Sequence, residues 1–397
     1  MIKRYIFVII LLIDTIVLLT ETTNLSISYA EALILYGDSS FLRFLVNSSI
    51  TVFGHNDFAL RLPMIIMHLL SVILLYDISK KYLSTQRDRI WLVLLYILLP
   101  GIISSALVVN SAGLVIFGLF FFVYVYEKYS LLIVNILLFS YLFVDSGFIY
   151  LYFGMSVYYI YNKQKYLALY NFILFLSSVY LYGIEAGGFP TGHFLDLVGV
   201  YSTIFTPFIF IFIFYALYRR YLTNQTNYIW YISSTTLVFS ILLSLRQRVL
   251  VEHFAPYIMI ALPLVAQTFV HSYKVRLKMF RTKYRVIFLA SFVFLVFNYL
   301  VVLFNKELYL FIDNPKKHFA YKTHVASQLA QKLKKENIHC VSTDEKMSLR
   351  LSFYGIKYCD YNILEEKDLN DKNSSNVTIS YMGKKLYTAS VTKLNKK

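Results

Sequence analysis

Arg246 and Arg248 are separated only by Gln247 in a short connection between two apolar stretches, and this arrangement suits the binding of a phosphate. A guanidinium is planar and can donate two hydrogen bonds to one anion, so a pair of arginines can hold a phosphate group. His253 follows in the same connection; it could contact the anion, orient a carboxylate, or be an interfacial histidine without a role. The sequence therefore predicts an anion site, and a lipid phosphate is the obvious ligand at a membrane surface.

Apolar stretches make up most of the first three-quarters of the chain, and they must position the connection that carries Arg246 and Arg248. Each is near the length that an α-helix needs to cross a bilayer, so we expect about eleven membrane-spanning helices. The first has a basic start like a signal peptide, but it carries Asp14 and lacks a small-x-small cleavage site, so we expect a retained span. The approximate bounds of the spans are 5–20, 58–78, 90–108, 112–127, 130–144, 148–161, 166–182, 201–218, 228–245, 254–273 and 286–304.

Basic residues indicate the orientation of these spans. If the N-terminus stays inside behind Lys3 and Arg4, basic clusters fall in every second connection, as the positive-inside rule requires. This alternation places the connection 246–253 and the region after residue 304 outside, where retained basic charge is unusual. The inside clusters are Lys80, Lys81, Arg87 and Arg89; Lys128; Lys163 and Lys165; Arg219 and Arg220; and the run over 274–285.

The composition excludes a soluble protein of this size. The chain has 397 residues, of which 58% are hydrophobic and 15% are charged, and its mean hydropathy is +0.59. Its net charge of +16 comes mostly from short connections, which suits contact with anionic membrane lipid and not with nucleic acid. We expect a multi-pass protein of a bacterial-type inner membrane, with its N-terminus in the cytoplasm.

The predicted fold is an all-α polytopic membrane bundle over residues 1–304 and a small extracytoplasmic α/β domain over residues 305–397. The long first outer loop, 21–57, has mixed helical periodicity over 27–35 and 41–53, which indicates helices lying along the membrane surface. In the last domain, a helix–strand–helix–strand order over 324–335, 338–342, 346–353 and 356–361 predicts a short parallel sheet, with 377–381 as a further strand candidate.

The two cysteines, Cys340 and Cys359, both belong to this predicted outer domain. Oxidation is permitted on that side of the membrane, so a disulfide can form there. Two isolated thiols in buried strands fit the sequence equally well.

The stretch Val52-Phe-Gly-His-Asn-Asp-Phe-Ala-Leu-Arg61-Leu-Pro63 resembles the FG-x-x-x-x-x-x-R-L-P stretch that leads into the second span of GT-C glycosyltransferases. These membrane enzymes, which include glycosyltransferase family 39, are related to protein O-mannosyltransferases and lipid A aminoarabinose transferases. Thr206-Pro207, Tyr218-Arg219-Arg220 and the run from Glu252-His253 to Leu262-Pro263 also look like this family. The order of span, long outer loop, many spans and small outer domain matches over nearly the whole chain.

The resemblance implies an enzyme, a hexosyl- or pentosyltransferase. It would move a sugar from a polyprenyl-phosphate donor to a lipid, glycan or protein acceptor at the outer face of the inner membrane. Arg246, Arg248 and His253 would then bind the donor phosphate and stabilise the charge that grows on it, while a carboxylate deprotonates the acceptor. Arg61 is expected to hold the first loop by pairing with its acids, or to snorkel at the end of a span. The resemblance implies no certain cofactor, although it is compatible with a divalent metal.

The sequence departs from the family at the position of the expected catalytic carboxylate. The family places an Asp, often Asp-Glu, a few residues before a Tyr-Ala pair, and before Tyr29-Ala30 those positions are Leu25 and Ser26. The acid often found in the next outer loop is also missing, since that loop reads Val109-Asn110-Ser111. Glu31 is the first choice for a replacement base and Glu21 the second.

The alternative for both glutamates is that they are solvated loop acids. As a residue on a loop surface, Glu31 would contribute little to stability. The competing function is a non-enzymatic membrane protein of the same fold, such as a transporter of lipid-linked glycans or a partner-binding relic.

Other ionisable residues are assigned to structural roles. Asp14 and His68 lie inside predicted spans, away from the outer site, so hydrogen bonding within the bundle is expected. His193 and Asp196, in a Gly-rich outer loop, could cover the donor, but a simple loop role is favoured. The sequence contains no Cys/His cluster with zinc-site spacing and no nucleotide fingerprint, so we expect neither a zinc site nor a nucleotide-sugar donor.

Overall fold

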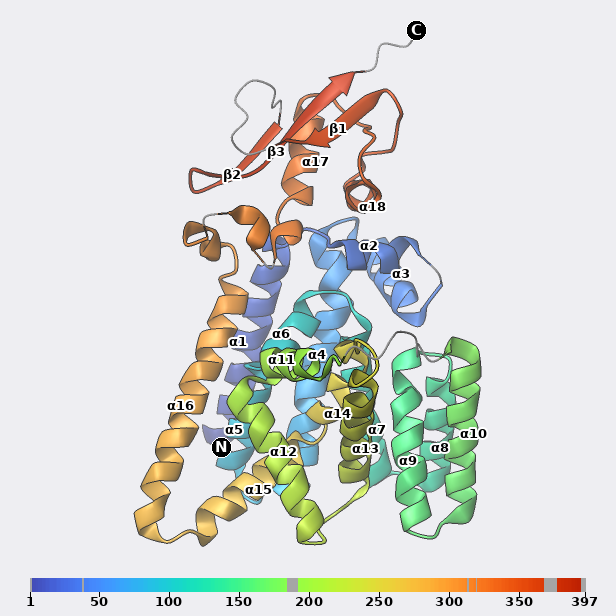
Figure 1. The fold of residues 1–397 in the computed structure, drawn as a ribbon, viewed down its shortest axis with the longest axis vertical. Helices are drawn as coiled ribbons and strands as arrows, with labels where there is room; N and C mark the ends of the chain where they lie inside the picture. Colours follow the sequence, from blue (N-terminus) through green and yellow to red (C-terminus); the bar gives the residue numbers. More distant parts are fainter. Residues whose placement is uncertain are drawn as a thin grey trace. The chain divides into compact units, whose positions relative to one another are not determined.

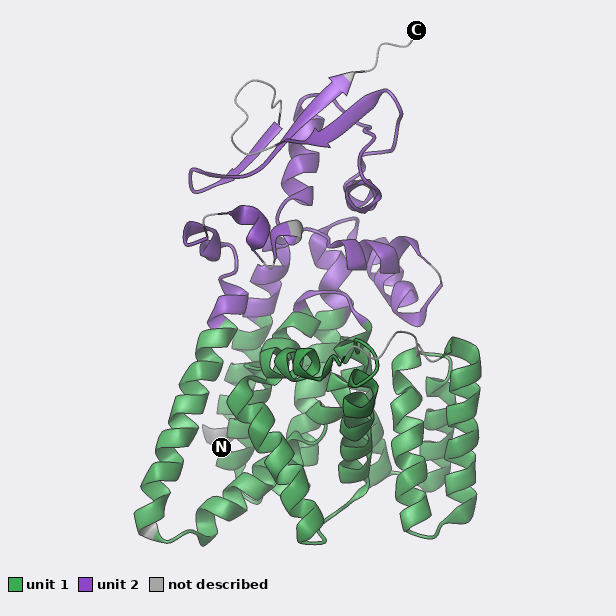
Figure 2. Cartoon of the chain, viewed as in Figure 1, with its two compact units in different colours: residues 1–15, 64–106, 111–299 green, residues 16–63, 107–110, 300–397 purple. Residues whose placement is uncertain are grey.

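The computed structural model of the chain describes residues 2–37, 39–183, 192–312, 314–318, 320–367 and 377–393 (Figure 1). These residues are mostly helical, with a small sheet near the C-terminal end. They group into two compact units: residues 1–15, 64–106 and 111–299 form unit 1, and residues 16–63, 107–110 and 300–397 form unit 2 (Figure 2). Unit 2 thus joins the long first loop with the C-terminal region, and the predicted boundary after residue 304 lies close to Leu300, where its last segment begins.

Unit 1 is built from helices. Each predicted span overlaps at least one of them. α1, α4, α6 and α16 also extend into unit 2. The helices are α1 (Ile2–Asn24), α4 (Asp57–Tyr82), α5 (Gln86–Ile97), α6 (Pro100–Leu107), α7 (Ser111–Lys128), α8 (Leu131–Tyr141), η1 (Ser146–Phe148), α9 (Ile149–Tyr161), α10 (Lys165–Tyr182), α11 (Phe194–Phe205), α12 (Pro207–Leu222), α13 (Tyr228–Ser244), η2 (Val251–His253), α14 (Ala255–Met259), α15 (Leu262–Val275) and α16 (Lys278–Leu303).

Four helices among the described residues are long and apolar enough to cross a membrane, namely those over 5–24, 57–82, 111–128 and 279–303. Counting each of three bent helix pairs as one span raises the number to seven. The expected total of about eleven spans is higher and stays a prediction. The apolar helices and their number are those of a multi-pass membrane protein.

Three predicted spans are not continuous helices. Span 90–108 bends by 61° between α5 and α6, span 201–218 by 104° between α11 and α12, and span 254–273 by 47° between Val251–Met259 and α15. Prolines explain these breaks, since Pro100 and Pro207 begin the second helix of their pairs and Pro263 is the second residue of α15. Thr206 adds a positive φ of 64° before Pro207.

Close approach of helices within unit 1 depends on small residues. A Cβ on Gly118 of α7 would lie 2.4 Å from the Phe148 ring, and a Cβ on Gly154 of α9 would lie 2.7 Å from the Ile232 backbone of α13. Inside the bundle, His68 Nε2 of α4 lies 2.8 Å from Asp14 Oδ2 of α1, and both side chains are buried. This pair gives each polar group a partner, as a bundle interior requires.

Connections that the charge alternation assigns to the cytoplasmic side are joined at one end of unit 1. Glu127, near the end of α7, accepts hydrogen bonds at 3.1 Å from both Lys81 Nζ and the Tyr82 hydroxyl, at the end of α4. The Tyr228 hydroxyl, at the start of α13, donates to the same carboxylate oxygen at 2.9 Å. The ends of three different predicted spans therefore meet at one carboxylate.

The first loop of unit 2 contains two helices, α2 (Tyr29–Tyr36) and α3 (Phe41–Phe53). α3 has the predicted bounds, and α2 begins two residues later than the predicted 27–35 stretch. Ser40 caps α3 by accepting a hydrogen bond from Arg43 N at 3.1 Å, and Leu42, Val46 and Ile50 form its buried face.

The C-terminal part of unit 2 corrects the predicted parallel sheet. After η3 (Glu307–Leu310), η4 (Pro315–Lys317) and η5 (Tyr321–Thr323), helices α17 (Ala326–Lys335) and α18 (Glu345–Phe353) lie near their expected positions. The sheet, however, consists of β1 (Asn362–Glu366), β2 (Val377–Tyr381) and β3 (Lys384–Lys393) in the order β1-β3-β2, with both pairs antiparallel. Segments 338–342 and 356–361 contribute only isolated parallel bridges, Cys340 to Lys357 and Ser342 to Ile363.

The antiparallel pairing of β2 with β3 follows from the turn between them. Met382 and Gly383 both have positive φ, 47° and 83°, as in the two-residue turns that connect β-hairpins. β3 was not expected from the sequence, because Lys384 and Lys385 make this tail polar. Its residues Leu386, Tyr387, Ala389 and Val391 are nevertheless buried, and the last three belong to a core that includes Leu329 and Leu333 of α17.

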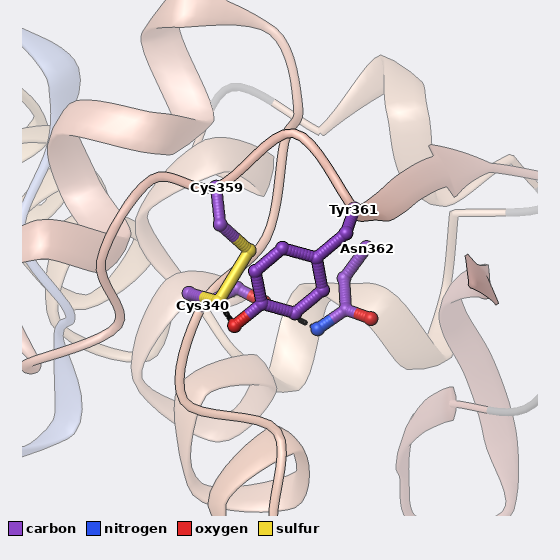
Figure 3. The surroundings of a disulfide bond; sticks show 4 residues. All are labelled: Cys340, Cys359, Tyr361 and Asn362. Atoms are coloured by element: carbon purple, nitrogen blue, oxygen red, sulfur yellow. Dashed lines mark hydrogen bonds between the residues drawn. A yellow bond between two sulfur atoms is a disulfide. The ribbon is translucent and has the colours of Figure 1, made fainter. Parts of the chain in front are cut away.

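Cys340 and Cys359 form a disulfide, which decides between the two alternatives that the sequence left open (Figure 3). Their Cα atoms are 5.5 Å apart, and their sequence separation is 19. The Tyr361 hydroxyl lies 2.8 Å from Cys340 Sγ, and Asn362 Nδ2 donates to Cys340 O at 3.0 Å. The bond therefore ties the segment after α17 to the segment that leads into β1.

Candidate functional site

Glu31 closes the start of α2. Its Oε2 accepts a hydrogen bond from Ser28 N at 2.8 Å, and Ser28 Oγ accepts one from Glu31 N at 3.2 Å. These two bonds form a capping box, which satisfies backbone donors that the first turn of a helix would otherwise leave free. The Ser-x-x-Glu spacing explains why the helix begins at Tyr29.

Arg61 binds the same carboxylate from α4. Its Nε donates to Glu31 Oε1 at 2.9 Å and its NH2 group donates to Glu31 Oε2 at 3.0 Å, so the pair is bidentate. Val109 N donates to Oε1 at 3.0 Å as well. Each Glu31 oxygen therefore accepts two hydrogen bonds, and the residue is only 1% exposed. The expectation that Glu31 is a solvated loop acid is wrong, because α4 and residue 109 cover it.

Arg61 also holds the chain between α1 and α2. Its NH1 group donates to Thr22 O at 3.1 Å and to Leu25 O at 2.6 Å, and its NH2 group donates to Ser26 O at 3.0 Å. Arg61 is fully buried, so it does not snorkel to water. This one side chain fixes the segment in which the resembling family carries its catalytic acid.

Leu25 and Ser26, at the family's acidic positions, are themselves buried. Ser26 N and Ser26 Oγ both donate to Thr323 O at 2.9 Å. Neither residue can take up a proton from an acceptor, so any base in this chain must lie elsewhere.

A second polar contact ties the first loop to α18. The Tyr354 hydroxyl donates to Asp57 Oδ1 at 2.6 Å and accepts a hydrogen bond from Ile27 N at 2.9 Å. Burial and the neighbouring Asp57 carboxylate raise the pKa of the Tyr354 hydroxyl, so it stays a donor. Arg350 Nε donates to Ile27 O at 2.9 Å, and burial lowers the pKa of Arg350. Residue 27 is thus held through both of its backbone polar groups.

Glu21, the second candidate base, lies near the end of α1 and is half-buried. Its carboxylate interacts with the Asn24 side chain and with the charges of Lys306 and Glu307. Its charged partners thus come from the start of the C-terminal region and not from the Glu31–Arg61 pair.

The predicted phosphate-binding residues belong to unit 1. Arg246 and Arg248 are exposed in the connection between α13 and η2, and His253 ends η2 and is half-buried. No carboxylate of the described ranges forms a salt bridge with either arginine. The structure thus leaves both guanidinium groups open to an anion, while Glu31, Glu21 and Arg61 form contacts in unit 2.

Asp145 is a further carboxylate in this part of unit 1 that sequence reasoning missed. It lies in the connection between α8 and α9, where its Oδ1 accepts a hydrogen bond from Gly147 N at 2.7 Å and caps η1. Burial raises the pKa of the Asp145 carboxyl, while the Gly147 amide and the charge of His253 act in the opposite direction. The sequence did contain a signal for it: Asp145 is an acidic residue between two apolar stretches, in a connection that the alternation of basic clusters places outside.

The backbone around Asp145 is held from the His253 side of the bundle. The Tyr257 hydroxyl, in α14, donates to Gly147 O at 2.5 Å and accepts a hydrogen bond from Leu151 N at 3.1 Å. A Cβ on Gly147 would meet Val115 of α7 at 2.5 Å, so this turn packs directly on that helix. η1 and η2 both contact α7, and the charge of His253 acts to lower the pKa of the Asp145 carboxyl, so these two residues are electrostatically coupled and are called the Asp145–His253 cluster below.

The Gly-rich outer loop lies partly outside the described residues, which resume at residue 192. His193 N donates to Ser244 O at 2.8 Å, and His193 Nδ1 lies 3.1 Å from Asp196 Oδ2. Ser244 is the last residue of α13, two residues before Arg246. Within the described ranges, no group of three or more His, Cys, Asp or Glu side chains is placed to hold a metal ion.

Comparison with known proteins gives one structural match. No protein-family model and no curated protein sequence matches the chain. The fold is similar to the apo crystal structure of ArnT from Cupriavidus metallidurans, with a TM-score of 0.54, 11% sequence identity, and coverage of 98% of this chain and 97% of that one. At this identity the likeness concerns the fold, and the chain therefore has the GT-C-like fold that the resemblance predicted.

Proposed function

We propose that this chain is a membrane glycosyltransferase that moves a sugar from a polyprenyl-phosphate donor to a lipid, glycan or protein acceptor at the outer face of the inner membrane. The observation that carries the proposal is the Asp145–His253 cluster in unit 1 together with Arg246 and Arg248. Two exposed arginines that form no salt bridge with a carboxylate of the described ranges follow α13, and the charge of His253 in the same connection acts on Asp145. The GT-C-like fold, shared with ArnT, supports a transferase as the class of protein.

In this proposal Arg246 and Arg248 bind the donor phosphate. As the bond between the anomeric carbon and the phosphate oxygen breaks, negative charge grows on the leaving polyprenyl phosphate. Two guanidinium groups stabilise that charge more than they stabilise the donor, so they accelerate the step. His253 adds a donor to the same phosphate.

The acceptor hydroxyl must lose its proton as its oxygen bonds to the anomeric carbon. We assign that proton to Asp145, because one of its oxygens is used by the Gly147 amide and the other has no hydrogen bond within the described ranges. Its partial burial makes it a stronger base than an exposed Asp. Glu31, the base expected from the sequence, is assigned to positioning, since protonating it would break a buried ion pair. Glu21 remains the second candidate base.

The experiment compares glycolipids and glycoproteins of cells that lack the gene with those of parent cells, by mass spectrometry. Wild type, Arg248→Ala and Asp145→Asn are then expressed in the deletion cells, with Arg87→Ala and Asp360→Asn as exposed controls of matched type. The glycan that disappears on deletion should return with wild type and both controls only. A glycan that returns equally with Arg248→Ala and Asp145→Asn would contradict the proposal.

A non-enzymatic role is the second candidate, and one observation favours it. The family's acidic positions, Leu25 and Ser26, are buried, and the first candidate base, Glu31, accepts four hydrogen bonds. Unchanged glycolipids and glycoproteins after deletion would favour this role, and restored export of a lipid-linked glycan would identify a transporter.

A further inference from the structure

A polar pocket of about 430 Å³ opens in unit 1, at the predicted cytoplasmic ends of α12 and α15. The end of α12, the connection to α13 and the last turns of α15 form its walls, and the predicted donor site uses none of them. The lining residues that matter below are Arg219, Arg220, Gln225, Gln267 and His271.

Arg220 is the central cation of the pocket. It is 7% exposed, its Nε donates to Gln225 O at 3.1 Å, and its NH1 group donates to Gln267 Oε1 at 2.9 Å. Both acceptors are neutral, so its positive charge is not balanced by its hydrogen-bond partners. Burying a cation without a counter-charge is unfavourable, and an anion in the pocket would offset that cost.

Arg219 adds a second cation beside it. Its NH1 group donates to the hydroxyls of Ser272 and Tyr215, which are again neutral. Across the described parts of the chain, neither Arg219 nor Arg220 forms a salt bridge with a carboxylate. The acid of the neighbouring network, Glu127, already binds Lys81, Tyr82 and Tyr228.

We propose that this pocket binds a phosphate group. Two guanidinium groups and the His271 ring place hydrogen-bond donors around one small volume, which is how proteins hold phosphate oxygens. A pocket of this volume accommodates a phosphate together with part of the group that carries it. The phosphate belongs to an anionic lipid head group or to a soluble phosphate monoester.

The surroundings favour the lipid as the source. Tyr218, Tyr221 and Leu222 project from the same end of α12 with 57%, 60% and 60% of their surface exposed. Tyrosines gather at the level of lipid head groups, and positive-inside alternation puts this end of α12 at the cytoplasmic leaflet, which carries anionic lipid. A head group in the pocket would therefore have its acyl chains beside apolar and aromatic side chains.

The test uses the purified full-length protein in detergent. Its thermal unfolding is measured with added phosphatidylglycerol, with phosphatidylcholine, and with inorganic phosphate. Arg219→Gln and His271→Gln remove pocket donors, and Arg276→Gln is the control, an exposed arginine outside the pocket. Arg220→Gln is measured too, but Arg219→Gln and His271→Gln keep the test valid if the buried change prevents folding.

Phosphatidylglycerol should raise the unfolding temperature of wild type and of Arg276→Gln. Arg219→Gln should weaken the apparent affinity of the protein for phosphatidylglycerol about tenfold or more, because a charge-assisted hydrogen bond is lost. Stabilisation by phosphatidylglycerol alone identifies a lipid ligand, and equal stabilisation by inorganic phosphate identifies a soluble one. The proposal is overturned if neither anion stabilises wild type, or if Arg219→Gln and His271→Gln respond to phosphatidylglycerol as wild type does.

Discussion

Arg61 and Glu31 form a bidentate ion pair that joins α4 to α2, and both side chains are buried. The two residues are 30 apart in sequence, and the carboxylate also caps α2 and binds residue 109. Three separate segments of unit 2 therefore meet at one carboxylate.

Removing either partner of this pair should destabilise the protein. Glu31→Gln or Arg61→Met leaves an uncompensated buried charge, which costs about 3–5 kcal/mol. Thermal unfolding in detergent should show a large drop for each single variant. The double variant should lose less than the sum of the two, because it leaves no unpaired charge. Additive losses, or a Glu31→Gln protein as stable as wild type, would contradict the buried pair.

Arg248 should be needed for transfer by its geometry as well as its charge. Arg248→Ala removes a charge-assisted contact worth about 1.5–3 kcal/mol, so transfer at subsaturating donor should fall roughly ten- to a hundred-fold. Arg248→Lys should recover only part of this, because a single ammonium cannot bind two oxygens as a fork. Wild-type transfer by a variant with both Arg246 and Arg248 changed to Ala would end the assignment.

Asp145→Asn should reduce transfer at least about a hundred-fold if Asp145 is the base. Glu31→Gln should retain transfer per folded molecule, and Glu21→Gln shows whether the role belongs to that residue instead. Because burial raises the pKa of Asp145, the wild-type rate should fall on acidification at a higher pH than an ordinary Asp would give. A pH–rate profile of kcat/KM measures this. The assignment fails if Asp145→Asn has the wild-type profile.

The same pKa shift also predicts how stability depends on pH: the rate falls on acidification, whereas stability falls as pH rises. A carboxyl whose pKa is raised by folding holds its proton more tightly in the folded state, so stability falls as pH rises from the unfolded pKa through the folded one. Asp145→Asn removes that loss and keeps an oxygen for the Gly147 amide. It should therefore be at least as stable as wild type at neutral pH, by thermal unfolding, and a clear destabilisation would contradict the shift.

The disulfide should both stabilise unit 2 and report the side of the membrane. For a closed loop of 19 residues, the chain-entropy estimate is about 3 kcal/mol, so Cys340→Ser with Cys359→Ser should lower the unfolding temperature. In intact cells, a membrane-impermeant maleimide should label these cysteines only after reduction by an impermeant reductant. Labelling without reduction, or only after cell lysis, would contradict an oxidised pair on the outer side.

Reporter fusions test the predicted orientation independently. A fusion after Lys165 should report the cytoplasm and one after Lys335 the outer side, because the basic clusters alternate between connections. If both fusions report the cytoplasm, the number of spans is wrong by an odd number.

Features that depend on short stretches of sequence could be predicted. Apolar length indicated where the bundle helices lie, and local sequence pattern indicated α3 at its bounds and α18 to within one residue. The Phe-Gly to Arg-Leu-Pro stretch, together with the order of spans and loops, led to the GT-C-like fold. Helical periodicity, span length and capping act over a few turns, so a window of sequence carries their full signal.

Contacts between distant segments could not be predicted. Tyr354 and Asp57 are 297 residues apart, and Asp145 interacts with His253 although different connections carry them. β3 was not predicted, because Lys384, Lys385 and Lys393 make the segment polar although all of residues 386–391 are buried in the structure. Glu31 was expected at a loop surface, but its carboxylate faces Arg61 from another helix. Whether a polar side chain meets water, a counter-charge or a backbone amide depends on which segments pack around it, and a single stretch of sequence does not contain that information.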